Sequence, residues 1–244
     1  MKALAIIPAR AGSRGVPGKN VYKLLGVKPV ICYTLDAALA AKKIDKAAVT
    51  TDDERVREIC RHQKYRYKVT LIERPAELAG DTSRIDDVMR HCCREITRQQ
   101  GYKPDIVVLL YANIPVRAEG IIDRTIEYLI STGADSVQTM ADVGKFHPDW
   151  LYKLEGDRAR KYTDNRIYRR QDLTPLNCID GAVGAVRYEV LEQAAGSDDP
   201  HAFWGTDRRG LIQETHETID IDTFRDLLMA EAVLREKQDG GITE

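Results

Sequence analysis

Apolar runs of strand length alternate along this chain with longer segments in which apolar residues recur at helical spacing. The run Asp-Ile-Val-Val-Leu-Leu-Tyr at 105–111 is apolar without alternation, which is typical of a central strand covered on both faces. The alternating order predicts a mainly parallel sheet with right-handed crossovers, in a three-layer α/β fold. The predicted strands cover residues 4–8, 47–51, 69–72, 105–111 and 136–140, and the predicted helices cover residues 29–43, 53–65, 83–99 and 120–132.

The regular pattern stops over residues 143–174, where the sequence becomes polar, aromatic and rich in arginine. Apolar alternation resumes at 181–191, and residues 223–238 form an amphipathic pattern that predicts a closing helix. The chain contains no linker rich in Pro or Gly, so residues 1–244 are predicted to form a single domain. We interpret 143–174 as an insertion that serves as a dimerisation arm or a lid.

Charge and hydropathy exclude several classes of partner. Lys and Arg number 37 and Asp and Glu number 38, so no net field attracts nucleic acid or an anionic membrane surface. No apolar run approaches the roughly 20 residues that span a bilayer, and the N-terminus shows no signal-peptide pattern, so we expect a cytoplasmic protein. The five cysteines form no C-x-x-C pair, which predicts reduced core residues.

A basic segment rich in glycine follows the first predicted strand. In a doubly wound fold, the turn after the first strand is a favoured site for phosphate groups. Glycines at 12, 15 and 18 let the backbone approach phosphate oxygens, and the same segment carries three cations. These cations are Arg10, Arg14 and Lys19. The segment therefore predicts a polyphosphate site, and the alternative is a surface loop with solvated charges.

The spacing of this segment excludes the two commonest phosphate-binding loops. Glycines at 12, 15 and 18 do not form G-x-G-x-x-G, the dinucleotide signature. A P-loop needs Gly in the position of Ser13, and Ser or Thr in the position of Asn20. The polyphosphate is therefore predicted to be held by a different loop.

Two aspartates near the C-terminus, Asp220 and Asp222, alternate with Ile219 and Ile221. In a strand, both carboxylates would lie on one side and both isoleucines would face the core. Mg²⁺ prefers oxygen ligands and usually takes one or two carboxylates together with phosphate oxygens, so the pair is a candidate metal site. The competing interpretation is that Asp222 caps the closing helix, which is predicted to begin directly after it.

The pattern Ile-Pro-Ala-Arg-x-Gly-Ser-Arg-x-x-Pro-x-Lys-Asn at 7–20 resembles the signature of the CMP-sialic acid synthetases, the acylneuraminate cytidylyltransferases. Four later segments are similar to motifs of the same family, in the same order. They are Val-Thr-Thr-Asp-Asp-Glu at 49–54, Glu-Arg-Pro-Ala-Glu-Leu-Ala-Gly-Asp-Thr-Ser at 73–83, Tyr-Arg-Arg-Gln-Asp-Leu at 168–173 and Ile-Asp-Ile-Asp-Thr at 219–223. The resemblance implies a Rossmann-like nucleotide-diphospho-sugar transferase fold. It also implies transfer of CMP from CTP to the hydroxyl of an acidic acceptor, a sialic acid-like 2-keto sugar acid, with release of pyrophosphate.

The resemblance further implies roles for individual residues. It assigns catalysis to Arg10, Lys19 and Asp222, and Mg²⁺ to Asp220 and Asp222. It assigns nucleotide contacts to Ala9, Arg10, Ala11, Gly12, Ser13, Arg14, Lys19, Asn20, Arg74, Asp81 and Ser83, and acceptor contacts to Tyr111, Arg170, Gln171 and Asp180. The alternative for Arg74, without the resemblance, is a surface residue before a turn. The family pattern also implies a homodimer in which the 143–174 arm reaches the partner's site.

The sequence departs from the family pattern where the acceptor should lie. Tyr111 stands where the family has Gln, and Asp180 to Gly184 replaces Asn-Gly-Ala-Ile-Tyr, which adds a carboxylate and removes an aromatic ring. A site with different hydrogen-bonding groups and one aromatic ring fewer is predicted to bind a different acceptor. Another ketodeoxy acid and a phosphonate are therefore the alternative acceptors. A sugar-phosphate nucleotidyltransferase and a catalytically inactive nucleotide-binding protein are the remaining alternatives.

Overall fold

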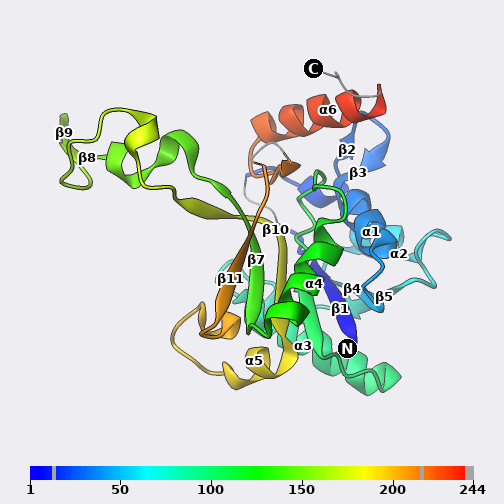
Figure 1. The fold of residues 1–244 in the computed structure, drawn as a ribbon. Helices are drawn as coiled ribbons and strands as arrows, with labels where there is room; N and C mark the ends of the chain where they lie inside the picture. The colour runs from blue at the N-terminus through cyan, green and yellow to red at the C-terminus, as the bar shows by residue number, and fades with distance from the viewer. Residues whose placement is uncertain (13–14, 215–216, 240–244) are drawn as a thin grey trace.

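The computed structural model describes residues 1–12, 15–214 and 217–239. At its centre is a seven-stranded sheet with the strand order β11-β7-β10-β6-β1-β4-β5 (Figure 1). The strands are β1 (Ala3–Pro8), β4 (Lys46–Thr51), β5 (Val69–Glu73), β6 (Ile106–Leu109), β7 (Ser136–Asp142), β10 (Asn177–Arg187) and β11 (Arg208–Ile212). Neighbouring strands are parallel except where β10 runs antiparallel to β6 and β7. The predicted mainly parallel sheet is confirmed.

Helices cover both faces of this sheet, so the predicted three layers are also confirmed. The helices are α1 (Val30–Ala40), α2 (Glu54–Arg61), α3 (Ile85–Gln100), α4 (Ile121–Thr132) and α5 (Tyr188–Gln193). α1, α2 and α4 pack on the face that carries Ile7, and α3 and α5 pack on the face that carries Ile6. Because side chains alternate along β1, consecutive apolar residues contribute to both cores.

A third apolar cluster joins the two ends of the chain. It combines the last helix, α6 (Phe224–Gln238), with the small hairpin of β2 (Lys23–Leu24) and β3 (Lys28–Pro29). Val16 from the glycine-rich loop and Ile221 from the aspartate segment are both buried in this cluster. Apolar packing therefore brings two residues that are 205 positions apart in sequence against each other.

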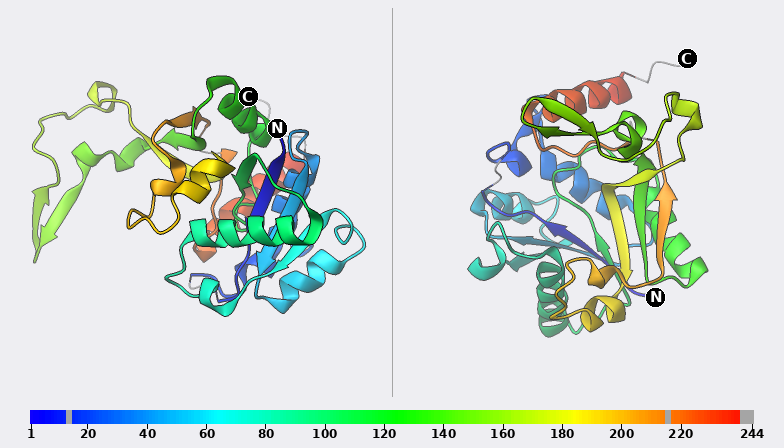
Figure 2. Two further views of the ribbon diagram at one scale, coloured as in Figure 1. Left: turned by 90° about the horizontal axis from the view of Figure 1, so that it is seen from below. Right: turned by 90° about the vertical axis from the view of Figure 1, so that its left-hand side faces the viewer.

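Residues 143–174 leave the body of the molecule as an extended arm (Figures 1 and 2). The arm contains an antiparallel hairpin of β8 (Tyr152–Glu155) and β9 (Arg158–Lys161), which the sequence pattern did not predict. All residues of both strands are exposed, so no apolar alternation marks them. Three short 3₁₀ helices complete the arm: η3 (Gly144–Phe146), η4 (Pro148–Trp150) and η5 (Arg170–Asp172).

Two predictions about local structure need correction. The strand predicted to end at Tyr111 ends at Leu109, so Tyr111 lies in the following loop. The aspartate segment makes only one isolated bridge, between Ile219 and Val116, and is not a strand. Its isoleucines are nevertheless buried and its aspartates exposed, because a single extended stretch already alternates its side chains.

Burial divides the five cysteines into four core residues and one exposed residue. Cys32, Cys60, Cys92 and Cys93 are free and buried as predicted, whereas Cys178 is free and exposed, so the core prediction is wrong for that residue. None of the helices in the described ranges has the length and apolar character needed to cross a membrane.

Candidate nucleotide-binding site

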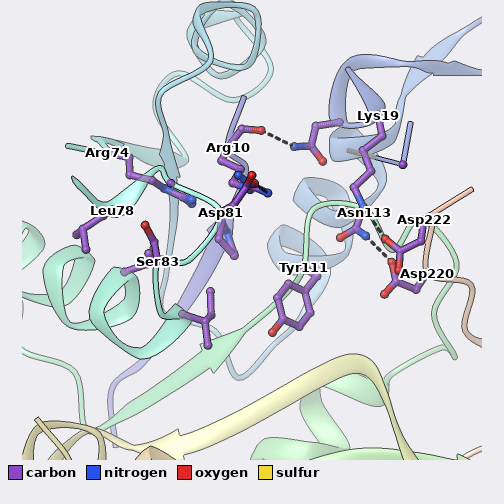
Figure 3. Close-up of a pocket in the computed structure, with 16 residues that line it drawn as sticks. Arg10, Lys19, Arg74, Leu78, Asp81, Ser83, Tyr111, Asn113, Asp220 and Asp222 are labelled. Carbon is purple, nitrogen blue, oxygen red and sulfur yellow. Dashed lines mark hydrogen bonds and ion pairs between the residues drawn. The ribbon is translucent and has the colours of Figure 1, made fainter. Parts of the chain in front are cut away.

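A cavity of about 430 Å³ lies at the carboxyl ends of β1, β5 and β6 (Figure 3). This is the edge at which a doubly wound sheet binds its ligands. The cavity brings together nine of the residues that the sequence predicted for nucleotide, metal or acceptor. They are Arg10, Lys19, Asn20, Arg74, Asp81, Ser83, Tyr111, Asp220 and Asp222.

Other predicted nucleotide contacts shape the loop after β1 without lining the cavity. The N–H of the buried Ala9 donates to a carbonyl of β4 at 3.0 Å. The N–H of Ala11 donates to the carboxylate of Asp52 at 2.8 Å. Gly12 has a φ of 73°, a left-handed conformation that glycine adopts without strain. The remaining two, Ser13 and Arg14, lie outside the described residues.

Lys19 connects the glycine-rich loop with the aspartate segment. Its Nζ donates at 2.8 Å to the carbonyl of Ile221 and at 2.8 Å to Oδ1 of Asp222 (Figure 3). The N-cap of α6 is Thr223, which forms a capping box with Asp226. The interpretation of Asp222 as the helix cap is therefore wrong. Its carboxylate contacts Lys19 and lines the cavity instead.

Asp220 lies on the same wall of the cavity as Asp222. Nδ2 of Asn113 donates to Oδ1 of Asp220. Asp220 faces the open cavity, but the surrounding protein displaces much of the water around its carboxylate. This desolvation raises the pKa of Asp220 to about 6, and the negative charge of Asp222 raises it further. Asn113 was not predicted from the sequence, although a polar residue just beyond a central strand is a signal for this edge of the sheet.

The carboxylates of Asp220 and Asp222 fit an open Mg²⁺ site and not a closed structural metal site. No cluster of three or more His, Cys, Asp or Glu side chains that could hold a metal occurs in the part of the chain that the structure describes. A closed structural site is therefore not formed by these residues. Mg²⁺ commonly takes one or two carboxylates and completes its shell with phosphate oxygens and water. Asp220 and Asp222 thus fit a Mg²⁺ ion whose remaining ligands are oxygens of a bound polyphosphate and water.

Two buried polar side chains stiffen the wall next to Arg10. Arg74 is 6% exposed, and its Nη2 donates to the carbonyl of Thr50 at 2.8 Å, so its interpretation as a surface residue is wrong. Burial lowers the pKa of Arg74 to about 10. Asn20 is also buried, and its Nδ2 donates to the carbonyl of Arg10 at 3.4 Å. These contacts fix the backbone from which Arg10 reaches the cavity.

Arg10 is paired with a carboxylate from the segment that follows β5. Nη2 of Arg10 lies 2.6 Å from Oδ1 of Asp81, and its Nη1 donates to the carbonyl of Ala79 at 3.4 Å. The two charged side chains are 33% and 38% exposed, so both remain in contact with solvent. A phosphate group that approaches Arg10 must therefore compete with Asp81 for the guanidinium.

With CTP, the nucleotide that the sequence resemblance predicts, we expect Asp81→Asn to lower KM by about two- to fivefold, because an exposed ion pair of this kind contributes only modestly and its loss frees Arg10. Initial rates at varied CTP measure this change. Glu77→Gln is the matched control, since it removes a carboxylate from the same segment at an exposed position. A higher KM for CTP in Asp81→Asn would show that Asp81 contacts the nucleotide directly.

The loop that carries Tyr111 is held by Arg117. The Arg117 guanidinium donates to the carbonyls of Tyr111 at 2.9 Å and Ala182 at 2.8 Å. Enclosure by protein lowers the pKa of Arg117 to about 9, and the charges of Asp180 and Asp220 oppose this shift. Arg117 therefore ties the loop of Tyr111 to β10.

Three residues predicted to contact the acceptor do not line the central cavity. Both carboxylate oxygens of Asp180 accept hydrogen bonds, Oδ1 from Thr139 at 2.5 Å and Oδ2 from Gln213. Arg170 and Gln171 belong to the arm and line a separate cavity of about 190 Å³ there. Of the predicted acceptor residues, only Tyr111 lines the central cavity.

A second cavity of about 330 Å³ adjoins the first, and Ile85 and Tyr111 line both. Trp204, from η6 (Ala202–Trp204), forms part of its wall. A β-carbon at Gly184 would overlap the ring of Trp204, so only glycine fits there. The indole of Trp204 therefore occupies the space directly over Gly184.

Comparisons with known proteins agree with this geometry. The cytidylyltransferase family model matches residues 4–180. An N-acylneuraminate cytidylyltransferase of Streptococcus agalactiae is 35% identical over 187 residues, which are 75% of this chain and 43% of that protein. The chain thus spans less than half the length of the streptococcal relative.

Two further relatives cover nearly the whole chain. The CMP-N,N'-diacetyllegionaminic acid synthase of Legionella pneumophila is 27% identical over 244 residues, 98% of this chain and 99% of that one. The solved structure of a CMP:2-keto-3-deoxy-manno-octonic acid synthetase complexed with CTP has a TM-score of 0.70 and 19% identity, and covers 97% of this chain and 100% of its own. The structural likeness supports the Rossmann-like fold. From the family match and the streptococcal relative together, we conclude that the chain belongs to the cytidylyltransferase family.

Proposed function

We propose that the protein transfers CMP from CTP to the hydroxyl of a sialic acid-like 2-keto sugar acid, with Mg²⁺ as cofactor and pyrophosphate as the second product. The observation that carries the proposal is the single cavity in which Arg10 and Lys19 face the carboxylates of Asp220 and Asp222. The names of the streptococcal and Legionella relatives support both the nucleotide and the class of acceptor.

In the proposed reaction, the acceptor oxygen forms a bond to the α-phosphorus of CTP, and the bond from that phosphorus to the β-bridging oxygen breaks. The acceptor proton is released to solvent, and the negative charge moves onto pyrophosphate. Such transfers depend on alignment and on neutralisation of the leaving group. Arg10 and Lys19 would supply these positive charges. Asp220 and Asp222 would hold Mg²⁺, which supplies Lewis-acid stabilisation of the phosphate oxygens.

The test is release of pyrophosphate from CTP and Mg²⁺ with a panel of acceptors. The panel contains sialic, legionaminic, pseudaminic and ketodeoxy acids, phosphonates and sugar 1-phosphates. We expect turnover with at least one sugar acid, and loss of turnover when the metal is chelated. Turnover only with ATP, GTP or UTP would contradict the use of CTP, and turnover only with sugar phosphates would favour a sugar-phosphate nucleotidyltransferase. CTP binding without any turnover would identify an inactive nucleotide-binding protein.

We further propose that the protein is a homodimer in which the arm completes the site of the partner. The arm projects from the body of the molecule (Figures 1 and 2). It carries exposed apolar side chains, among them Phe146, Leu154 and Tyr168. A second copy of the chain would cover these side chains. It would also place Arg170 beside an acidic acceptor, where a guanidinium is well suited to bind a carboxylate.

A mixture of two inactive variants tests this arrangement. We expect Arg170→Ala and Asp222→Asn to be nearly inactive alone, and an equal mixture that is allowed to exchange subunits to regain about a quarter of the wild-type rate, because half of the dimers then contain one intact site. Sedimentation measures the dimer, and pyrophosphate release measures the rate. A mixture that stays inactive although its subunits exchange would show that Arg170 does not act across the dimer.

A further inference from the structure

The segment that carries Asp220 and Asp222 is extended but belongs to no strand. Its backbone forms one isolated bridge, at Ile219, and the N–H of Ile221 donates to a carbonyl of the neighbouring loop at 3.0 Å. Side chains alternate in an extended stretch, so Thr218 lies on the same side of the segment as both aspartates. A contact that holds Thr218 therefore limits rotation of the segment and sets the direction in which both carboxylates point.

The side chain of Gln213 contacts Thr218 and connects it to the sheet. Gln213 directly follows β11, which lies beside β7 (Figure 1), and it is 6% exposed. Its Nε2 donates to Oγ1 of Thr218 at 2.5 Å and also to Oδ2 of Asp180. An amide nitrogen carries two N–H groups, so both donors of this amide are used. Gln213 thus bridges Asp180 and Thr218.

Asp180 is the fixed end of this bridge. Its Oδ1 accepts from Oγ1 of Thr139 at 2.5 Å and from the N–H of Ala182 at 2.9 Å. Thr139 is fully buried in β7. The register of β10 against β7 shifts between Ile179 and Gly184, so Asp180 lies where the ladder of backbone hydrogen bonds is interrupted. The carboxylate supplies an acceptor at this interruption and is thereby anchored to the central sheet.

The carboxylate of Asp180 also determines which way the amide of Gln213 points. If the amide were turned over, its Oε1 would face Oδ2 of Asp180, and two acceptors would oppose each other. The observed orientation encloses Oε1 without a donor among residues 1–12, 15–214 and 217–239, which is unfavourable by itself. Asp180 therefore imposes this orientation, and the orientation directs an N–H group to Thr218.

We propose that Asp180 and Gln213 are positioning residues, which hold Thr218 so that the two aspartates of the segment face one Mg²⁺ ion. The inference rests on the proposed function and gives Asp180 a role in metal binding. Hydrogen bonds that orient metal ligands typically change metal affinity by about 10- to 100-fold when they are lost. Because the bridge acts on the aspartate segment alone, its loss should weaken metal binding more than CTP binding.

Binding of Mn²⁺ with CTP, in the absence of any acceptor, tests this role without turnover. Mn²⁺ replaces Mg²⁺ because its electron paramagnetic resonance signal distinguishes free from bound ions, and a titration of CTP alone is the reference. Thr218→Val keeps the shape of the side chain and removes its hydroxyl. We expect it to raise the Kd for Mn²⁺ about tenfold, whereas Thr218→Ser keeps the hydroxyl and should stay within about twofold of the wild type. Calorimetry without metal should show CTP affinity changed by less than about twofold.

Steady-state rates at varied Mg²⁺ give a second readout. Thr218→Val should need about tenfold more Mg²⁺ for its half-maximal rate of pyrophosphate release and reach a kcat within about threefold of the wild type at saturating Mg²⁺. Gln213→Met removes both N–H groups and should cause a similar shift. The double variant should shift no further than Gln213→Met alone, because the two residues act through one hydrogen bond.

Two substitutions of Asp180 test the fixed end of the bridge. Asp180→Leu removes both acceptors, and we expect it to raise the Kd for Mn²⁺ about tenfold. Asp180→Asn allows the amide of Gln213 to turn over, so that Oε1 accepts from the new amide and from the hydroxyl of Thr218. The bridge then persists with its donors reversed, and the Kd should stay within about twofold of the wild type.

Thr70→Val is the matched control for Thr218→Val. Thr70 lies near the amino end of β5, away from the cavity, and its hydroxyl accepts a hydrogen bond from the amide of Gln100 at 3.0 Å. Its loss removes the same kind of contact and should leave the Kd for Mn²⁺ unchanged. Thermal unfolding shows which variants are folded, and Thr218→Val is decisive because it leaves the contact of Gln213 with Asp180 intact.

The outcomes separate this inference from the proposed function. If the wild type releases pyrophosphate and folded Thr218→Val binds Mn²⁺ as the wild type does, the inference is wrong and the proposed function stands. If Thr218→Val weakens CTP binding as much as Mn²⁺ binding, its hydroxyl supports the whole cavity, and the inference is equally overturned. If no acid releases pyrophosphate from CTP, the proposed function itself fails, and the inference fails with it.

Discussion

Asp222→Asn should lower kcat/KM for pyrophosphate release on the order of a thousandfold while the protein stays folded. The substitution removes the negative charge that faces Lys19 at 2.8 Å and that is proposed to hold Mg²⁺ with Asp220. Stability should change by less than about 1 kcal/mol, because Asp222 is exposed and the cap of α6 is supplied by Thr223. Steady-state rates and chemical unfolding measure the two effects separately.

Asp226→Asn is the matched control for this prediction, because it makes the same chemical change four residues away. Asp226 accepts hydrogen bonds from the N–H groups of Asp222 and Thr223 and so completes the capping box. Its loss should cost about 1 kcal/mol of stability and leave kcat/KM within about threefold. If Asp222→Asn instead unfolds the protein, or keeps more than a tenth of the activity, the metal role of Asp222 is refuted.

The inner strands of the fold could be predicted because burial on both faces leaves a strong sequence signal. β1 and β6 are covered by helices on each side, so their residues form continuous apolar runs. β11 was missed because it lies at the edge of the sheet and begins with Arg208 and Arg209, both exposed. The hairpin of the arm was missed for the same reason. Strands held mainly by backbone hydrogen bonds, with few buried side chains, leave little pattern in a sequence.

Much of the lining of the first cavity could be predicted because its residues are concentrated in a few short segments. The lining of the second cavity could not, because the sheet assembles it from positions that are uninformative alone. Gln138 lies in an apolar strand, and only the register with Gly184 and Gly210 shows that its amide faces a cavity. Trp204 is 20 residues from Gly184 in sequence, yet it fills the space over that glycine. Such relations depend on tertiary packing, which single-sequence periodicity does not contain.

Gly15→Ala should lower kcat/KM on the order of a hundredfold, because a displacement of about 1 Å at a catalytic group has effects of that size. A β-carbon at position 15 would overlap the carbonyl oxygen of Asp222 and lie 3.2 Å from its carbonyl carbon. Both atoms belong to the backbone, so the strain cannot be relieved by a side-chain rotation. Either the glycine-rich loop or the aspartate segment must move, and both carry residues of the proposed phosphate and metal site.

Gly80→Ala is the control, because Gly80 lines the same cavity and its β-carbon would meet only Ser83 Oγ, at 3.4 Å. It should leave kcat/KM within about threefold and stability within about 0.5 kcal/mol. Gly15→Ala should also lose about 1–3 kcal/mol of stability through overpacking, and CTP with Mg²⁺ should restore little of it. Rates measured well below the unfolding temperature separate the two losses. Wild-type activity in Gly15→Ala would mean that the loop and Asp222 move apart during turnover, and that their close packing does not set the position of the metal-binding carboxylates.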